Sequence, residues 1–316
     1  MQHFIERART KNWIGFGARA ALLLVGAIWG SSLVVVKSAA EYISPNFLIA
    51  LRFTAAFAVL ALIFWRRLRG VSRSLLGRCA VIGACLFLAY WIQTIGVTFA
   101  MPGKSAFLSS IYCVLVPFIY WLISGQKPKL RNLLAAVLCV GGIVLTSVTG
   151  GFTMELGDML ALLSGIFFAA HIAVVGKLGQ GEDPIVVTIL QFGFCALFAW
   201  IATFALEGVH MTWDRRALGG VLYLALFCTM LALLLQNVGQ KYTNPSSASL
   251  ILSLESVFGV LFGVFFFHEI MNLRLITVFV LIFVAIVISE TELSFLKGKK
   301  KRCETRQTNS NQREIC

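Results

Sequence analysis

Charged residues are scarce in this sequence. Asp, Glu, Lys and Arg make up 13% of its 316 residues, hydrophobic residues make up 59%, and the mean hydropathy is +0.86. Soluble domains carry roughly a quarter charged residues, so this composition excludes an ordinary soluble globular protein. Because charges are scarce, apolar stretches run long enough to cross a bilayer core, which takes about 20 helical residues. The sequence therefore predicts an all-α integral membrane protein.

Histidine is also scarce, and no metal-binding pattern accompanies it. There are 4 His spread over the chain, and the 8 Cys form no CxxC or Cys/His spacing. We therefore expect no metal and no cofactor. The cysteines fall in or beside predicted spans or in the tail, rather than in external loops, which argues against a disulfide framework.

Clustered catalytic groups are missing too. An enzyme acting on lipid-linked substrates needs acid–base or metal groups gathered at one membrane face. The His residues have no carboxylate cluster beside them, so we expect the protein not to be an enzyme. Such an integral-membrane enzyme, and a non-transporting membrane scaffold, stay as alternatives to transport.

Long apolar spans fill most of the chain, and ten of them are predicted. They lie at about 18–36, 45–65, 76–99, 105–123, 133–148, 157–176, 185–205, 217–238, 246–266 and 273–290. The predicted organisation is a cytoplasmic N-terminal arm at 1–17, five helices at 18–148, five helices at 153–290 and a basic cytoplasmic tail at 295–316. The polar composition of the tail predicts disorder.

Basic residues outnumber acidic ones by 27 to 14, which gives a net charge of +13. Most of the Lys and Arg fall in the N-terminal arm, in alternate loops and in the tail, with Arg215 and Arg216 as an exception. This positive-inside pattern predicts a multi-pass protein of the cell (inner) membrane with both termini in the cytoplasm. We expect the basic loops and the run at 299–302 to meet anionic membrane lipids. We expect no nucleic-acid partner.

The two sets of five spans resemble each other. Pro45 is followed seven residues later by Arg52, and Pro184, 139 residues further on, is followed seven later by Gln191. At a spacing of 143, the residues Gln93, Gly96, Pro102 and Ser110 match Gln236, Gly239, Pro245 and Ser253. Because five is odd, the second set enters the membrane from the opposite side. Inverted repeats of this kind are typical of alternating-access carriers.

Two charged residues stand out inside predicted spans. An ionisable group in hydrocarbon costs about 2.5–3.5 kcal/mol on insertion scales, so each needs a partner or a function. Arg52 is a candidate anchor for an anionic substrate group, or else it caps carbonyl groups or anchors the helix at the interface. Glu255 is the candidate proton-coupling residue, because low-polarity surroundings favour the protonated carboxyl. It is also a candidate partner for a cationic group, or a neutral acid bonded to a neighbouring helix.

Other polar and aromatic side chains are predicted to form the wall of a substrate cavity, since small-molecule sites combine apolar walls with a few fixed polar groups. The substrate-binding candidates are Trp29, Ser32, Arg52, Tyr90, Trp91, Gln93, Tyr112, His171, Gln236 and Glu255. For His171 and the aromatic residues, ordinary packing in the protein is the alternative.

Several motifs resemble those of the EamA module in the drug/metabolite transporter superfamily. They are Trp29-Gly30-Ser31-Ser32, Pro45 with Arg52-Phe53, residues 104–112 with Val116-Pro117, and residues 249–258 ending at His268-Glu269. The resemblance implies ten helices in two inverted five-helix repeats, with a cavity lined mainly by the first, third, fourth, sixth, eighth and ninth. It also implies efflux or exchange of a small-molecule solute such as an amino acid. One departure concerns Ser256, which stands where the family usually has the proline that kinks the ninth helix.

Overall fold

The computed structural model describes residues 2–128, 155–212 and 214–268, together with isolated positions at 130–141 and 273–284. These residues form helices, and their one β-bridge joins Ile43 to Met211. In chain order the elements are α1 (Gln2–Ala39), α2 (Pro45–Ile63), the 3-10 helix η1 (Trp65–Leu68), α3 (Arg73–Phe99), α4 (Pro102–Ser109), α5 (Tyr112–Ser124), α7 (Leu156–Leu178), α8 (Pro184–Ala202), the π-helix η2 (Thr203–Glu207), α9 (Arg215–Tyr223), the π-helix η3 (Leu224–Leu231), α10 (Ala232–Tyr242), α11 (Pro245–Leu252) and α12 (Glu255–Phe267).

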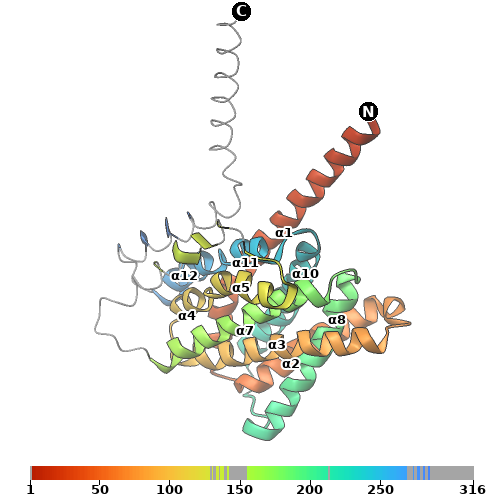
Figure 1. Cartoon of the computed structure of the whole chain (residues 1–316). Helices are drawn as coiled ribbons and strands as arrows, with labels where there is room; N and C mark the ends of the chain where they lie inside the picture. The colour runs from red at the N-terminus through yellow and green to blue at the C-terminus, as the bar shows by residue number, and fades with distance from the viewer. Residues whose placement is uncertain are drawn as a thin grey trace, which may run out of the picture.

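Eight helical segments of the described chain are long and apolar enough to cross a membrane. They begin and end within a few residues of the spans predicted from the sequence. The first is the exception, since α1 already begins at Gln2 and the predicted N-terminal arm continues it as helix, away from the bundle (Figure 1). The predicted spans at 133–148 and 273–290 and the tail at 295–316 lie largely or wholly outside the described residues.

Proline sets the start of four helices. Pro45, Pro102, Pro184 and Pro245 each occupy the first turn of their helix, where the missing N–H is no loss and the fixed φ suits the helix. The side chain of Asn244 accepts a hydrogen bond from Ser246 N at the start of α11. Pro102 and Pro245, which match each other in the sequence repeat, thus both begin helices.

The fourth and ninth predicted spans are each broken, which the sequence analysis did not anticipate. α4 ends at Ser109 and α5 begins at Tyr112, and α11 ends at Leu252 and α12 begins at Glu255. At both breaks, backbone N–H groups donate to the carbonyl oxygen three residues earlier, as in a 3-10 turn, and serine hydroxyls donate to nearby carbonyl oxygens. Side chains of this kind restore hydrogen bonds to a broken membrane helix. The ninth span thus bends without a proline at position 256.

The two halves of the chain pack on each other throughout. α3 lies against α7 and α8, α2 lies against α8, and α1 lies against α10 and α12. α4 also lies against α12, and α5 against α7 (Figure 1). Among the described helices, contacts within one half are fewer than contacts between the halves.

Glycines of one half lie against the helix breaks of the other half. A Cβ on Gly26 of α1 would lie 3.4 Å from Glu255 N, at the break between α11 and α12. A Cβ on Gly165 of α7 would lie 2.7 Å from Ser109 O, at the break between α4 and α5. Gly26 and Gly165 are 139 residues apart, the spacing of the sequence repeat. Each broken helix is therefore held against a glycine of the other half.

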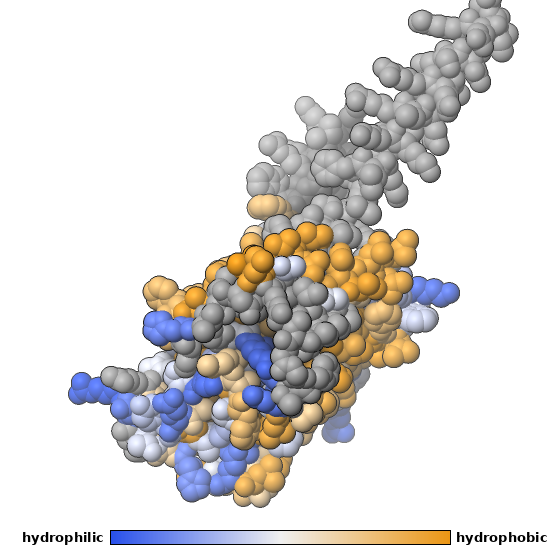
Figure 2. All heavy atoms as spheres, turned by 90° about the vertical axis from the view of Figure 1, so that its left-hand side faces the viewer, coloured by the Kyte–Doolittle hydropathy of each residue, from blue (hydrophilic) through white to orange (hydrophobic). Residues whose placement is uncertain are grey.

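Large apolar side chains cover much of the outer surface. Leu62, Leu122, Phe204 and Phe265 are each at least 70% exposed. In the end-on view of Figure 2, hydrophobic residues follow the upper and right-hand margin, and hydrophilic residues gather in patches at the lower left. A soluble monomer rarely exposes so much apolar surface. The outer surface therefore suits a lipid environment, and the protein is a multi-pass membrane protein.

Candidate functional site

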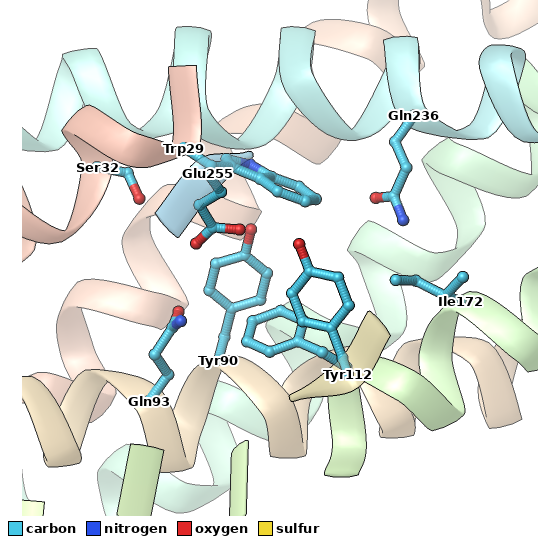
Figure 3. A pocket seen from close by; sticks show the side chains of 9 residues that line it. Trp29, Ser32, Tyr90, Gln93, Tyr112, Ile172, Gln236 and Glu255 are labelled. Carbon is cyan, nitrogen blue, oxygen red and sulfur yellow. The ribbon is translucent and has the colours of Figure 1, made fainter. Parts of the chain in front are cut away.

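A closed cavity lies between the two halves of the molecule. Its lining residues are Trp29, Ser32, Tyr90, Gln93, Tyr112, Phe168, Ile172, Gln236 and Glu255 (Figure 3). They come from α1, α3, α5, α7, α10 and α12, which belong to the predicted first, third, fourth, sixth, eighth and ninth spans. Each lining residue is at most 8% exposed, and the space between them has room for about one water molecule.

Glu255 enters the cavity from a helix start. It is the first residue of α12 and follows the break after α11 directly. Its carboxyl group points toward the hydroxyls of Tyr90 and Tyr112 (Figure 3). The dipole at the start of a helix favours a negative charge, whereas burial of Glu255 at 6% exposure disfavours it. Glu255 is the one carboxylic acid among the lining residues.

Aromatic rings form much of the cavity wall. Trp29 donates its indole N–H to the carbonyl oxygen of Cys228 at 2.9 Å, so this donor is already used and the ring faces the cavity (Figure 3). Tyr90 and Phe168 pack edge to face with their ring centres 5.3 Å apart. The π-helix η3 supplies the Cys228 carbonyl. Wide turns of this kind are frequent at functional sites.

Two amides and a phenol offer polar groups to the cavity. Gln93 donates to Ser109 Oγ at 3.4 Å, and Gln236 donates to Gln240 Oε1 at 3.4 Å. Within the described residues, the buried Gln236 Oε1 atom has no hydrogen-bond partner, whereas the Tyr112 hydroxyl faces the Glu255 carboxyl and is within hydrogen-bonding range of it. A buried polar atom without a partner is costly, so Gln236 Oε1 is suited to receive a ligand.

Arg52 does not line the cavity. It is 1% exposed, donates from Nε to Thr229 Oγ1 at 2.7 Å, and lies 4.7 Å from the ring centre of Tyr90. In the part of the chain that the structure describes, its Nη2 atom has no hydrogen-bond partner and no carboxylate pairs with it. Tyr90 thus separates a fixed positive charge from the space around Glu255.

Two further candidates from the sequence also lie away from the cavity. His171 is buried, with Nε2 3.0 Å from Gln191 Oε1, which agrees with the packing alternative. Trp91 stacks on Phe87 with ring centres 5.6 Å apart. The other seven candidates, Trp29, Ser32, Tyr90, Gln93, Tyr112, Gln236 and Glu255, all lie around the cavity.

The sequence analysis missed two lining residues, Phe168 and Ile172 of α7. Both are apolar and carry no chemical signal of their own. The repeat could have indicated Phe168, because it lies 139 residues after Trp29. Gln93 pairs with Gln236 and Tyr112 with Glu255 at the other repeat spacing, 143. Three repeat pairs thus contribute six of the lining residues.

Metal chemistry finds no support in the described residues. No group of three His, Cys, Asp or Glu residues there is arranged to hold a metal ion. Among the described cysteines, Cys79, Cys85, Cys195 and Cys228 are free thiols. Cys139, Cys303 and Cys316 lie outside the described residues.

The relatives of this chain are transporters. The EamA-like transporter family matches residues 17–148 and again residues 155–291. An uncharacterized transporter of Archaeoglobus fulgidus is 32% identical over 276 residues, covering 86% of this chain and 85% of its own length. The uncharacterized transporter YvbV of Bacillus subtilis is 23% identical, covering 87% of this chain and 92% of its own.

Two other comparisons also cover most of this chain. The protein PagO of Salmonella typhimurium is 24% identical, covering 72% of this chain and 78% of its own. A solved crystal structure has the same fold, with a TM-score of 0.65 at 19% identity, and the match covers 89% of this chain and 96% of the other. Because the family match covers nearly the whole helical part of the chain, this protein belongs to the EamA-like transporter family.

Proposed function

We propose that the protein is a secondary transporter that exports or exchanges a small organic metabolite, such as an amino acid or a related compound, by alternating access. The observation that carries the proposal is the closed cavity, which both halves of the chain line and which contains a buried acid. The transporter names of the relatives support it. The two halves, at 18–148 and 153–290, are proposed to be inverted five-helix repeats of a ten-helix protein.

Contacts between the halves at both ends of the bundle support alternating access. At one end, Lys104 of α4 pairs with Asp158 of α7, with Nζ 2.7 Å from Oδ2. At the other end, Arg67 of η1 pairs with Asp183 at 2.7 Å, and Arg78 of α3 pairs with Glu182. A carrier that rocks one half against the other opens one set while the other holds.

Backbone hydrogen bonds also join the two halves at the end with the Lys104–Asp158 pair. Ser44 N donates to His210 O and Thr212 N donates to Tyr42 O, at 3.1 and 2.8 Å. We assign the end with Arg67 and Arg78 to the cytoplasm, because basic loops favour that side. The Lys104 end then faces outward in the cell membrane. The basic loops and the run at 299–302 are proposed to contact anionic lipids.

Glu255 is proposed to couple transport to a proton. Its carboxyl lies in a closed cavity at the interface of the two halves, so either opening exposes it to a different side of the membrane. A group in that position can take up a proton from one side and release it to the other. Transport is then expected to depend on the pH gradient, and the Glu255→Gln variant is expected to lose that dependence.

Proteoliposomes test the proposed function. Purified protein is reconstituted, a mixture of labelled small metabolites is loaded inside, and their exchange against the same mixture outside is followed by mass spectrometry. We expect at least one solute to exchange faster than in protein-free vesicles, with loss in Glu255→Gln. The matched control is Glu41→Gln, which makes the same change at an exposed site.

The same experiment separates the alternatives. A membrane enzyme converts a lipid-linked substrate into a product whether or not a gradient is present. A scaffold shows neither exchange nor conversion. Absence of exchange for every solute, with correctly inserted protein, overturns the transport proposal.

A further inference from the structure

We propose that the solute bound in the cavity is a small organic ammonium cation, for which Glu255 is the counter-ion and for which it exchanges a proton. The inference rests on the proposed transport function and goes further by naming the substrate class. Four observations carry it: the charge of the lining residues, their aromatic rings, their hydrogen-bonding groups, and the position of Arg52.

The cavity carries one kind of charge. Its nine lining residues include one acid and no Lys, Arg or His. An anionic solute entering it would meet the carboxyl of Glu255 with no cation to balance the two charges. A cationic solute would instead neutralise a buried carboxylate, which otherwise costs several kcal/mol to keep charged. The lining charge therefore favours a cation.

The aromatic wall favours the same charge. Trp29, Tyr90, Tyr112 and Phe168 line the space beside Glu255. The faces of aromatic rings attract cations, and cages of such rings recognise ammonium ligands. Trp29 uses its N–H on the Cys228 carbonyl, so its ring is the part it offers to a ligand. One face of Tyr90 already holds the Arg52 guanidinium, 4.7 Å from the ring centre, which leaves the remaining rings for the solute.

The hydrogen-bonding groups of the cavity are mainly acceptors. The Oε1 atom of Gln236 is buried and, among the described residues, has no donor bonded to it. Its Nε2 atom is engaged with Gln240, and the Nε2 atom of Gln93 is engaged with Ser109. An ammonium group has only donors to offer. Glu255 and the Gln236 amide oxygen can both accept from it, on different sides of the cavity (Figure 3).

The position of Arg52 argues against an anionic solute. Its guanidinium donates to Thr229 of η3 and stacks on Tyr90, which stands between it and the cavity. A carboxylate or phosphate would have to displace Tyr90 to reach it. The cation of Arg52 instead acts as a fixed charge behind the wall.

Competition between solute and proton follows from the groups that face Glu255. Titratable groups within electrostatic range are Tyr112 of α5, Tyr90 of α3 and Cys228 of η3. Phenol and thiol groups are ordinarily neutral at physiological pH. The described residues of α1 and α11 that face Glu255 are not titratable, and Lys104 of α4 is paired with Asp158. Glu255 is thus the group that loses its proton when an ammonium ion binds.

The closed space limits the size of the solute. With room for about one water molecule, the cavity must widen to accept any organic ion. The helix breaks at residues 110–111 and 253–254 lie immediately before Tyr112 and Glu255. At these breaks the lining can shift without unwinding a continuous helix. A compact cation therefore suits the site better than an extended one.

Binding of three compounds of one shape tests the inference on the purified full-length protein. The probes are 3,3-dimethylbutylammonium as cation, 3,3-dimethyl-1-butanol as neutral compound and 3,3-dimethylbutanoate as anion, compared by isothermal titration. We expect the cation to bind at least about tenfold more tightly than the neutral compound, because the carboxylate and the aromatic rings add to its affinity. The anion is expected not to bind measurably.

Two variants and the release of protons sharpen the test. In weak buffer, binding of the cation is expected to release one proton per site from the native protein and from the surface control Glu41→Gln. Glu255→Gln is expected to release none and to bind the cation no better than the neutral compound. Its folding is checked by its thermal unfolding, which the isosteric change should leave intact.

Each outcome decides the inference. Equal binding of all three probes, preference for the anion, or no binding of the cation to folded native protein overturns it. Proteoliposome exchange of other solutes would then show that the protein is still a transporter and that only the substrate class was wrong. Absence of both binding and exchange overturns the transport proposal as well.

Discussion

The two halves of the chain contribute residues at matching repeat positions to the cavity wall, but the side chains at these positions differ in charge. In the sequence repeat, Trp29 corresponds to Phe168, Gln93 to Gln236, and Tyr112 to Glu255, and all six residues line the cavity. The aromatic and amide pairs are conservative, and the third pair places an acid opposite a phenol. Both members of that pair follow a helix break directly. The comparison teaches that the scaffold of the site is duplicated, while its charge comes from the second half alone.

The largest effect is expected when the charge difference is removed. Glu255→Gln makes both halves of the wall neutral, and we expect transport to fall by about 30-fold or more, equivalent to about 2 kcal/mol. Tyr112→Phe changes the matching position in the first half and should cost only a few-fold. Initial rates in proteoliposomes measure both. A larger loss in Tyr112→Phe than in Glu255→Gln would contradict the assignment of the charge to the second half.

The two glycines at the helix breaks give the next largest effect. Gly165→Ala places a methyl group 2.7 Å from Ser109 O, whereas Gly26→Ala places it 3.4 Å from Glu255 N. Overpacking costs about 1–3 kcal/mol, so Gly165→Ala should lower the thermal unfolding temperature clearly. For Gly26→Ala, the helix preference of alanine, worth up to about 1 kcal/mol, offsets a mild contact. Equal shifts in the two variants would show that the breaks are not packed as the structure has them.

Arg52 and Gln191 are the other unequal pair, and here the charge lies in the first half. Arg52→Gln equalises the pair and removes the hydrogen bond to Thr229 and the contact with Tyr90. We expect a loss of stability of about 1–2 kcal/mol, with an apparent KM for the transported solute that changes less than about twofold. Thermal unfolding and transport kinetics measure the two. A large rise in KM with unchanged stability would return Arg52 to a direct role in substrate binding.

The smallest effects separate the two ends of the bundle. Lys104→Ala leaves Asp158 unpaired with its side chain 4% exposed, whereas Arg67→Ala leaves Asp183 at 35% exposure. We expect the first to cost about 1 kcal/mol and the second less than about 0.5 kcal/mol, since exposed pairs contribute little. Thermal unfolding of the two variants at low and at high salt measures these losses of stability. If Arg67→Ala lowers the stability more, the end with Arg67 is the more tightly held of the two.

The helices and most of the cavity residues were accessible from the sequence. Apolar length gave the eight described spans to within a few residues, because the bilayer thickness fixes the length of a span. The candidates were chosen among polar and aromatic residues inside those spans, and Tyr90, Gln93, Tyr112, Gln236 and Glu255 all line the cavity. Phe168 and Ile172 escaped, because apolar residues in an apolar helix carry no pattern that marks the side facing a cavity.

Arg52, Trp91 and His171 show where sequence reasoning ended. All three lie inside helices that the sequence predicted, but the direction of each side chain depends on how its helix is rotated against its neighbours. Packing of α2 on α8 and η3 turns Arg52 toward Thr229 and the ring of Tyr90. His171 faces Gln191 of α8 for the same reason. Hydrophobicity on all faces of a membrane helix leaves its rotation open.

By itself, the sequence determined that this is a many-span helical membrane protein with a duplicated pattern and two isolated intramembrane charges, since composition and spacing suffice for that. The tertiary structure alone decided that the fourth and ninth spans break beside Tyr112 and Glu255. It also decided that Glu255 faces the cavity while Arg52 lies behind Tyr90. The reason is physical: hydrogen bonds at a break and the rotation of a helix are set by contacts between distant segments, and those exist only once the two halves have packed together.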